Sequence, residues 1–144
     1  MSDRWTRRII HLPLMALAAS IAWSPGAVQA LTISIDLRPD DPPPTIVAPR
    51  AQGRLPVGIL TTDTFDATTV APATIRLGPT GTEAAPVRIN RADVDRDGDT
   101  DLQLFFAIQD LGVKCGDKLL ILKGRTTGEQ EVEGSASIVT EGCE

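Results

Sequence analysis

Apolar and polar residues alternate along most of the chain that follows residue 30. In residues 31–38 every second position is apolar and polar residues lie between them, a pattern typical of a half-buried β-strand. Further short strands are predicted where similar patterns recur between turns rich in Gly, Pro and Thr. They cover residues 55–60, 74–77, 87–89, 102–108, 119–125 and 132–139. We therefore predict an all-β fold, a single β-sandwich-like domain.

Two segments depart from this alternation. Residues 39–53 contain many prolines, which lack an amide donor and restrict the residue before them, so a loop without regular structure is expected there. The stretch DATTVA after Phe65 predicts a short helical turn with Asp66 as its N-cap.

The first 30 residues do not resemble part of a fold. A basic start leads into an apolar run, then a Pro-Gly break, and then the small residues that signal peptidase accepts. A membrane anchor is the alternative, but the apolar run is short for a bilayer span. We predict a signal peptide over residues 1–30, cleavage between Ala30 and Leu31, and a mature domain over residues 31–144. The mature protein would be secreted or periplasmic, with no membrane association.

Removal of residues 1–30 makes the chain more acidic. It leaves 11 of 14 basic and 18 of 19 acidic residues, so the net charge changes from −5 to about −7. The mature chain also loses its only histidine and both tryptophans, and the chain has no tyrosine. Such a domain has no basic patch to neutralise phosphates, so nucleic-acid binding is not expected.

The chain has two cysteines, Cys115 and Cys143. Export would place both in an oxidising compartment, where an even number of cysteines predicts a structural disulfide. A redox-active or nucleophilic thiol is the alternative, and a disulfide would exclude it.

Residues 93–101 read DVDRDGDTD, with an aspartate at every second position. Their spacing, D-x-D-x-D-G-x-x-D, fits a calcium loop, because calcium binds six to eight hard oxygen ligands and such a loop can direct alternate side chains inward. Gly98, at position 6, permits the sharp left-handed turn that the loop requires. Position 12, which is a glutamate in an EF-hand, is Leu104 within a strand, so we predict a strand-loop-strand site. The predicted metal ligands are Asp93, Asp95, Asp97, Asp99 through its backbone carbonyl, and Asp101 as the bidentate ligand.

Other interpretations of this loop are weaker. A solvated acidic turn would need no ion, but it would not require this spacing together with a glycine at position 6. Magnesium prefers a few carboxylates with retained waters. Zinc lacks its usual ligands, because the mature chain has no histidine and its cysteines are expected to be paired.

Three segments carry a resemblance to a known group: LPVGILTTDTFDATTVAPATIRLGPTG, DVDRDGDTDLQLFFAIQDLGVKCGD and GRTTGEQEVEGSASIVTEGC. Together they resemble a poorly characterised module of exported bacterial proteins, and the resemblance covers most of residues 31–143. It implies an extracellular β-rich fold with calcium at the acidic loop, and no established activity. Arg96 stands where that group often has glycine. The loop is also similar to those of dockerins and integrin-type propeller repeats, but this chain has one copy.

No catalytic arrangement is evident in the mature chain. Without histidine there is no base for a serine triad. Asp63 and Asp66 could be a glycosidase carboxylate pair, but a turn residue and a helix cap explain them better. We predict a non-enzymatic, calcium-binding structural or adhesive module. The alternatives are an accessory or catalytic domain acting on extracellular polysaccharide and a calcium-dependent protein-binding module.

Overall fold

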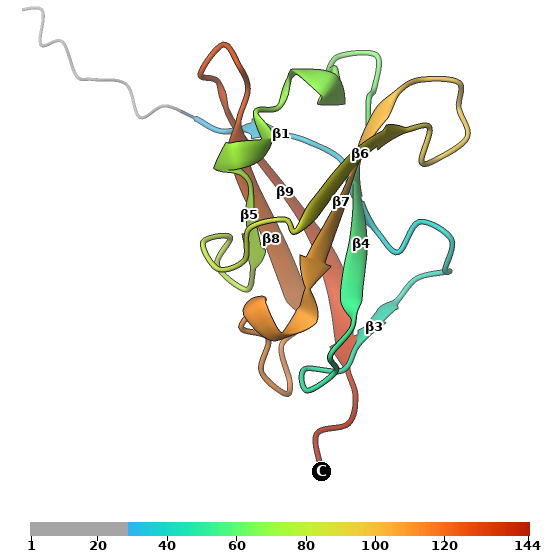
Figure 1. Ribbon diagram of the computed structural model, residues 1–144, viewed down its shortest axis with the longest axis vertical. Coiled ribbons are helices and arrows are strands. Elements are labelled where there is room, and N and C mark those ends of the chain that lie inside the picture. The colour runs from blue at the N-terminus through green and yellow to red at the C-terminus, as the bar shows by residue number, and fades with distance from the viewer. Residues whose placement is uncertain (1–28) are drawn as a thin grey trace, which may run out of the picture.

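A computed structural model describes residues 29–144, which fold into two β-sheets packed against each other (Figure 1). The first sheet has the order β1-β9-β8-β5, with β3 also paired to β9. Its strands are β1 Leu31–Thr32, β3 Thr45–Val47, β5 Arg76–Gly78, β8 Leu119–Arg125 and β9 Glu131–Thr140. The second sheet has the order β2-β4-β7-β6. Its strands are β2 Ile35–Leu37, β4 Arg54–Ile59, β6 Arg88–Ala92 and β7 Asp101–Ala107. The predicted all-β, sandwich-like fold is confirmed.

Helical structure in residues 29–144 is confined to three-residue 3₁₀ turns. They are η1 Ala67–Thr69, η2 Pro72–Thr74 and η3 Ile108–Asp110. None of these elements is long and apolar enough to cross a membrane. Asp66 is the N-cap of η1, as predicted, and its carboxylate accepts a hydrogen bond from the Thr68 backbone N–H at 2.9 Å. The predicted signal peptide falls almost entirely outside the described residues.

The core lies between the two sheets and follows the predicted alternation. In β4 and β7, which pair antiparallel, alternate residues face inward and are buried. They are Leu55, Val57, Ile59, Leu102, Leu104 and Phe106. Residues of the other sheet close the core from the opposite side: Leu77, Leu120, Leu122, Val132 and Ile138. Removal of these side chains from water is the main stabilising contribution to the fold.

The first predicted strand is divided between the two sheets. The Ile33 N–H donates to the Glu133 carbonyl at 2.9 Å in the first sheet, whereas the Leu60 N–H donates to the Ser34 carbonyl at 3.0 Å beside the second. The chain packs closely against Gly134 at this crossing, where a Cβ would lie 3.0 Å from the Ile33 carbonyl oxygen. The continuous alternation of residues 31–38 therefore conceals a change of sheet.

The proline-rich segment is not entirely irregular. β3 lies within it and pairs parallel with the end of β9, with Thr45 opposite Ile138 and Val47 opposite Thr140. Val47 is fully buried, and the Thr45 hydroxyl donates to the Leu37 carbonyl at 3.1 Å. The expectation of a loop throughout residues 39–53 was wrong for these three residues. Thr-Ile-Val alternates buried and exposed positions, and the prolines restrict only themselves and the residues before them.

The predicted disulfide between Cys115 and Cys143 is present, with a Cα–Cα distance of 5.7 Å. It joins the turn before β8 to the chain end after β9. The Gly116 N–H also donates to the Thr140 hydroxyl at 2.9 Å, so the same two segments are held by a hydrogen bond. The alternative of a reactive thiol is excluded for this form of the protein.

Candidate metal centre

The acidic residues lie in the loop that joins β6 to β7, two adjacent antiparallel strands. Ala92, the last residue of β6, is opposite Asp101, the first residue of β7. The loop projects at the end of the sandwich away from the C-terminus (Figure 1). The strand-loop-strand placement predicted from the sequence is therefore correct, and the paired strands hold both ends of the loop.

Four carboxylates converge in this loop. Asp93, Asp95, Asp97 and Asp101 each offer an oxygen, and these oxygens all lie within 4.8 Å of one another. Asp101 is fully buried at the base of the cluster, and the other three side chains are exposed. Oxygen donors at these separations could hold a hard metal ion.

Two left-handed residues wind the loop around the cluster. Arg96 has φ +60° and Gly98 has φ +93°, so the turn expected at Gly98 is present and a second one precedes it. Both oxygens of Asp93 accept backbone hydrogen bonds across the loop, Oδ1 from the Asp97 N–H at 3.1 Å and Oδ2 from the Gly98 N–H at 2.9 Å. A carboxylate oxygen has two lone pairs, so these bonds orient Asp93 and leave it able to bind a cation.

Asp101 connects the loop to a distant part of the chain. Its Oδ1 accepts from the Thr61 N–H at 2.8 Å, and its Oδ2 accepts from the Val94 N–H at 2.7 Å. The Thr61 hydroxyl donates to the Thr100 carbonyl at 2.7 Å and accepts from the Ala67 N–H at 3.0 Å. Thr61 therefore fastens the loop to the segment between β4 and η1. Sequence reasoning missed this residue, because no local pattern marks a contact made 40 residues away.

The cluster is electrostatically strained. The pKa of Asp95 is raised to about 6 by partial loss of hydration, by a hydrogen bond with the Asp97 side chain, and by the charges of Asp101 and Asp97. Because the Asp95 side chain is exposed, we consider its crowding by other carboxylates decisive. The pKa of Asp99 is also raised, most strongly by the charge of Asp97. A bound cation would favour the ionised form of both groups.

Asp99 differs from the other loop aspartates. Its carboxylate is not one of the four converging groups, and its backbone N–H donates to Asp97 Oδ1 at 2.9 Å. Asp99 lines a separate shallow hollow of about 410 Å³ beside the loop. The other residues lining that hollow are Thr61, Asp66, Thr68, Arg91 and Thr100. The Asp99 carboxylate thus lies apart from the cluster, and its predicted carbonyl ligand stays a prediction.

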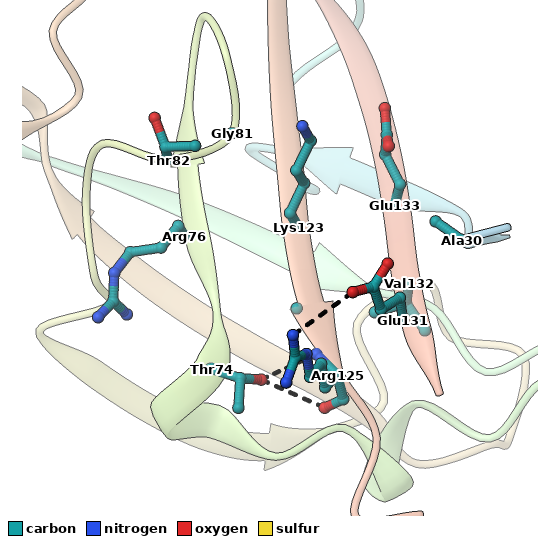
Figure 2. A pocket seen from close by; sticks show the side chains of 11 residues that line it. Ala30, Thr74, Arg76, Gly81, Thr82, Lys123, Arg125, Glu131, Val132 and Glu133 are labelled. Carbon is teal, nitrogen blue, oxygen red and sulfur yellow. Dashed lines mark hydrogen bonds and ion pairs between the residues drawn. The ribbon is translucent and has the colours of Figure 1, made fainter. Parts of the chain in front are cut away.

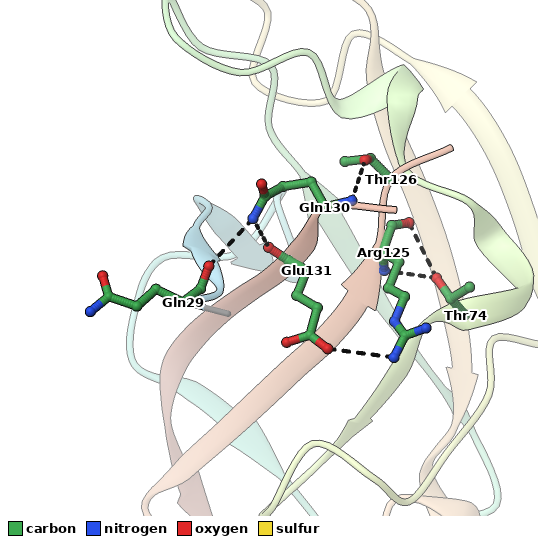
Figure 3. A network of polar contacts seen from close by, with 6 residues as sticks. All are labelled: Gln29, Thr74, Arg125, Thr126, Gln130 and Glu131. Atoms are coloured by element: carbon green, nitrogen blue, oxygen red, sulfur yellow. Dashed lines mark hydrogen bonds and ion pairs between the residues drawn. The ribbon is translucent and has the colours of Figure 1, made fainter. Parts of the chain in front are cut away.

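A larger hollow of about 560 Å³ crosses the outer face of the first sheet (Figure 2). Its charged lining residues come from β5, β8 and β9: Arg76, Lys123, Arg125, Glu131 and Glu133. Arg125 and Glu131 form an ion pair at 3.4 Å, drawn in Figure 3 with the neighbouring bonds of Thr74 and Gln130. Lys123 is directly opposite Glu133 across the strands, and an Arg76 Nη1–H donates to the adjacent Ile75 carbonyl at 2.7 Å. These charges have partners nearby on the sheet, so we assign the hollow no ligand.

No family model matches this chain, and no match was found among curated proteins or solved structures. The comparisons therefore do not link the acidic loop to dockerins or propeller repeats. The fold and the loop define a class on their own: a disulfide-containing β-sandwich-like domain with an acidic inter-strand cluster that could hold a metal ion.

Proposed function

We propose that this protein is an exported calcium-binding module with a structural or adhesive role, in which the ion stabilises the loop between β6 and β7. The observation that carries the proposal is the convergence of four carboxylates within 4.8 Å, with the buried Asp101 at their base. Burial of a charged group is unfavourable unless an opposite charge or hydrogen bonds compensate for it. Two backbone N–H groups donate to the Asp101 carboxylate, and a bound divalent cation would supply the opposite charge.

Calcium fits the arrangement better than other common ions. The donors are oxygens only, the loop offers several carboxylates, and three of the four are exposed and able to adjust. Calcium accepts many oxygen ligands in flexible geometry, whereas magnesium requires a near-ideal octahedron and retains several waters. Both cysteines are consumed in the disulfide, which removes the ligands that zinc favours.

Export is proposed from two independent features. A disulfide such as Cys115–Cys143 forms and persists in oxidising compartments, and residues 1–30 have the composition of a signal peptide. A secreted or periplasmic location also supplies the calcium concentrations that weak extracellular sites require. The resemblance to the exported bacterial module leads to the same proposal.

The proposed role is not enzymatic. The Asp66 carboxylate, considered above as one of a catalytic pair, is occupied by capping: it accepts hydrogen bonds from the Thr68 N–H and from the Thr68 hydroxyl at 2.6 Å. These bonds lower the pKa of Asp66, which is opposite to the raised pKa of a general acid. Residues 31–144 also contain no histidine.

Isothermal titration calorimetry of the chelator-stripped protein tests the proposal. We expect calcium to bind at one site and magnesium to bind more weakly. Asp97→Ala removes a converging carboxylate and should abolish binding, whereas Asp99→Ala, the matched control in the same loop, should retain it. Equal loss of binding in both variants would show that the assignment of side-chain and backbone ligands is wrong. Absence of calcium binding to the unmodified protein would refute the proposed function.

A further inference from the structure

β6 has the longest open edge of the second sheet. It pairs with β7 along one side, and within residues 29–144 no strand pairs with its other side. The opposite edge strand of the second sheet, β2, has only three residues. In the first sheet, the edge strand β5 is covered by a bridge between Leu77 and Ala84. An open strand edge presents unpaired N–H and C=O groups to any extended chain that approaches it.

The side chains along this edge are both apolar and basic. Val87 is 51% exposed and Ile89 is 39% exposed, which is high for aliphatic residues beside a core. Arg88 and Arg91 are also exposed, and the segment from Val87 to Ala92 has no acidic residue. Arg91 also lines the hollow that contains Asp66 and Asp99, so Arg88 is the basic residue of the edge without an acidic residue in its own segment or in that hollow. The Arg88 guanidinium lies over the Phe105 ring, 5.8 Å from its centroid, which holds this charge beside the edge.

We propose that the β6 edge binds an extended acidic peptide segment by strand addition. The backbone of the peptide would pair with β6, a carboxylate would meet each arginine, and an apolar residue would cover Ile89. The arginines are three positions apart and point to opposite faces of the sheet, because strand side chains alternate. The matching peptide therefore carries two acidic residues at the same spacing. This proposal deepens the proposed function, on which it rests, by naming the class of partner.

A second copy of the same edge is a poor occupant. Symmetric antiparallel pairing of two β6 strands would bring Arg88 or Arg91 of one copy near the same residue of the other copy, on one face of the sheet, and like charges on adjacent strands are destabilising. An acidic segment reverses the sign of both interactions. Charge therefore selects a different chain over self-association.

The metal loop begins immediately after Ala92, at one end of this edge. Without an ion, Asp93 and its neighbours would repel an acidic peptide. Bound calcium would neutralise two of the negative charges of the loop and would hold β6 and β7 in register. Calcium should therefore increase the affinity for acidic peptides, which makes the adhesive contact responsive to the ion.

Fluorescence anisotropy with labelled ten-residue peptides tests this proposal. The probe has Glu-Thr-Val-Glu at its centre, and the control peptide has lysine in place of both glutamates. With the protein in saturating calcium, we expect the acidic probe to bind and the lysine peptide not to bind. The double variant Arg88→Glu, Arg91→Glu should weaken the acidic probe roughly tenfold or more and should bind the lysine peptide instead. Lys123→Glu, a matched charge reversal on the other sheet, should leave probe binding unchanged.

Hydrogen exchange distinguishes strand addition from simple charge attraction. The bound probe should slow exchange of β6 backbone amides, and a probe N-methylated at alternate residues should lose binding. Binding that survives N-methylation, or that Lys123→Glu weakens equally, would overturn the proposal. A dimer with protected β6 amides would identify a second copy as the occupant and would also overturn it. Because calorimetry measures calcium separately, a protein that binds calcium but not the probe contradicts only this inference. One that binds the probe but not calcium contradicts the proposed function and the calcium dependence of the contact, and supports strand addition at β6 alone.

Discussion

Chelation of calcium is the perturbation that most directly tests the role of the acidic loop. Without the ion, four carboxylates within 4.8 Å of one another repel, and one of them, Asp101, is buried at the start of β7. The Asp101 carboxylate also accepts a hydrogen bond from the Thr61 N–H. Repulsion in the loop should therefore destabilise β7 and the segment that follows β4. We therefore expect a loss of global stability as well as local fraying of the loop.

The size of the effect follows from binding linkage. A ligand that binds only the folded state adds RT ln(1 + [L]/Kd) to the free energy of unfolding, about 2.7 kcal/mol when its concentration is a hundred times Kd. A weak extracellular site with Kd about 10⁻⁴ M reaches that ratio in roughly 10 mM calcium. For a domain of this size, that free energy corresponds to a rise of about 10 °C in the melting temperature.

The melting temperature can be measured by differential scanning fluorimetry with an extrinsic dye, because the mature chain has no tryptophan. Thermal unfolding followed by circular dichroism gives the same quantity. The melting temperature should fall on addition of EGTA and recover when calcium is restored. Asp97→Ala should melt at the same temperature with and without calcium, and Asp99→Ala should keep the calcium response. A melting temperature of the unmodified protein that does not change with chelator would refute the reasoning and leave the loop as a solvated acidic turn.

Three further predictions follow from the same contacts. The pKa of Asp95 is raised to about 6, so the ion-free fold binds that proton more tightly than the unfolded chain does and loses stability as pH rises from about 4 to about 6. Because calcium binds the ionised carboxylate, calorimetry should also show the calcium Kd rising about tenfold from pH 7 to pH 5. In chelator, Asp101→Asn should lower the free energy of unfolding by about 2 kcal/mol, because its amide NH₂ would face a backbone N–H donor. Asp97→Asn, at an exposed position, should change it by less than about 0.5 kcal/mol. Urea unfolding measures both changes. Replacing Cys115 and Cys143 by serine opens a bridge that spans 28 residues and should lower the free energy of unfolding by roughly 3 kcal/mol; an unchanged urea midpoint would contradict this.

The parts of the fold that the sequence predicts are those set by local patterns. Leu102, Leu104 and Phe106 alternate with partly buried residues because β7 has one face toward the core, and that periodicity is visible in one dimension. The spacing of the loop aspartates and the position of Gly98 are equally local, as is the Asp66 cap. For these features the physical requirement and the residues that meet it lie within a few positions of each other.

The features that escaped prediction depend on contacts between distant segments. Residues 31–38 pass from one sheet to the other where the chain packs closely against Gly134, about a hundred positions away. β3 pairs parallel with the end of β9, and the buried Asp101 carboxylate accepts a hydrogen bond from the Thr61 N–H, 40 residues away. An open edge such as that of β6 is likewise visible only when the order of all strands is known.

The position of Asp101 explains why the proposed ion would matter to the whole domain rather than to one turn. An exposed acidic loop could release its ion and fluctuate without disturbing the sheets. Asp101, by contrast, is both the buried carboxylate of the cluster and the first paired residue of β7, opposite Ala92 of β6. Under the proposed function, calcium compensates a charge that is already inside the fold, so ion binding and the pairing of β6 with β7 are coupled. The same coupling links the loop to the open edge of β6, because an acidic strand can add there only if β6 itself is held in place.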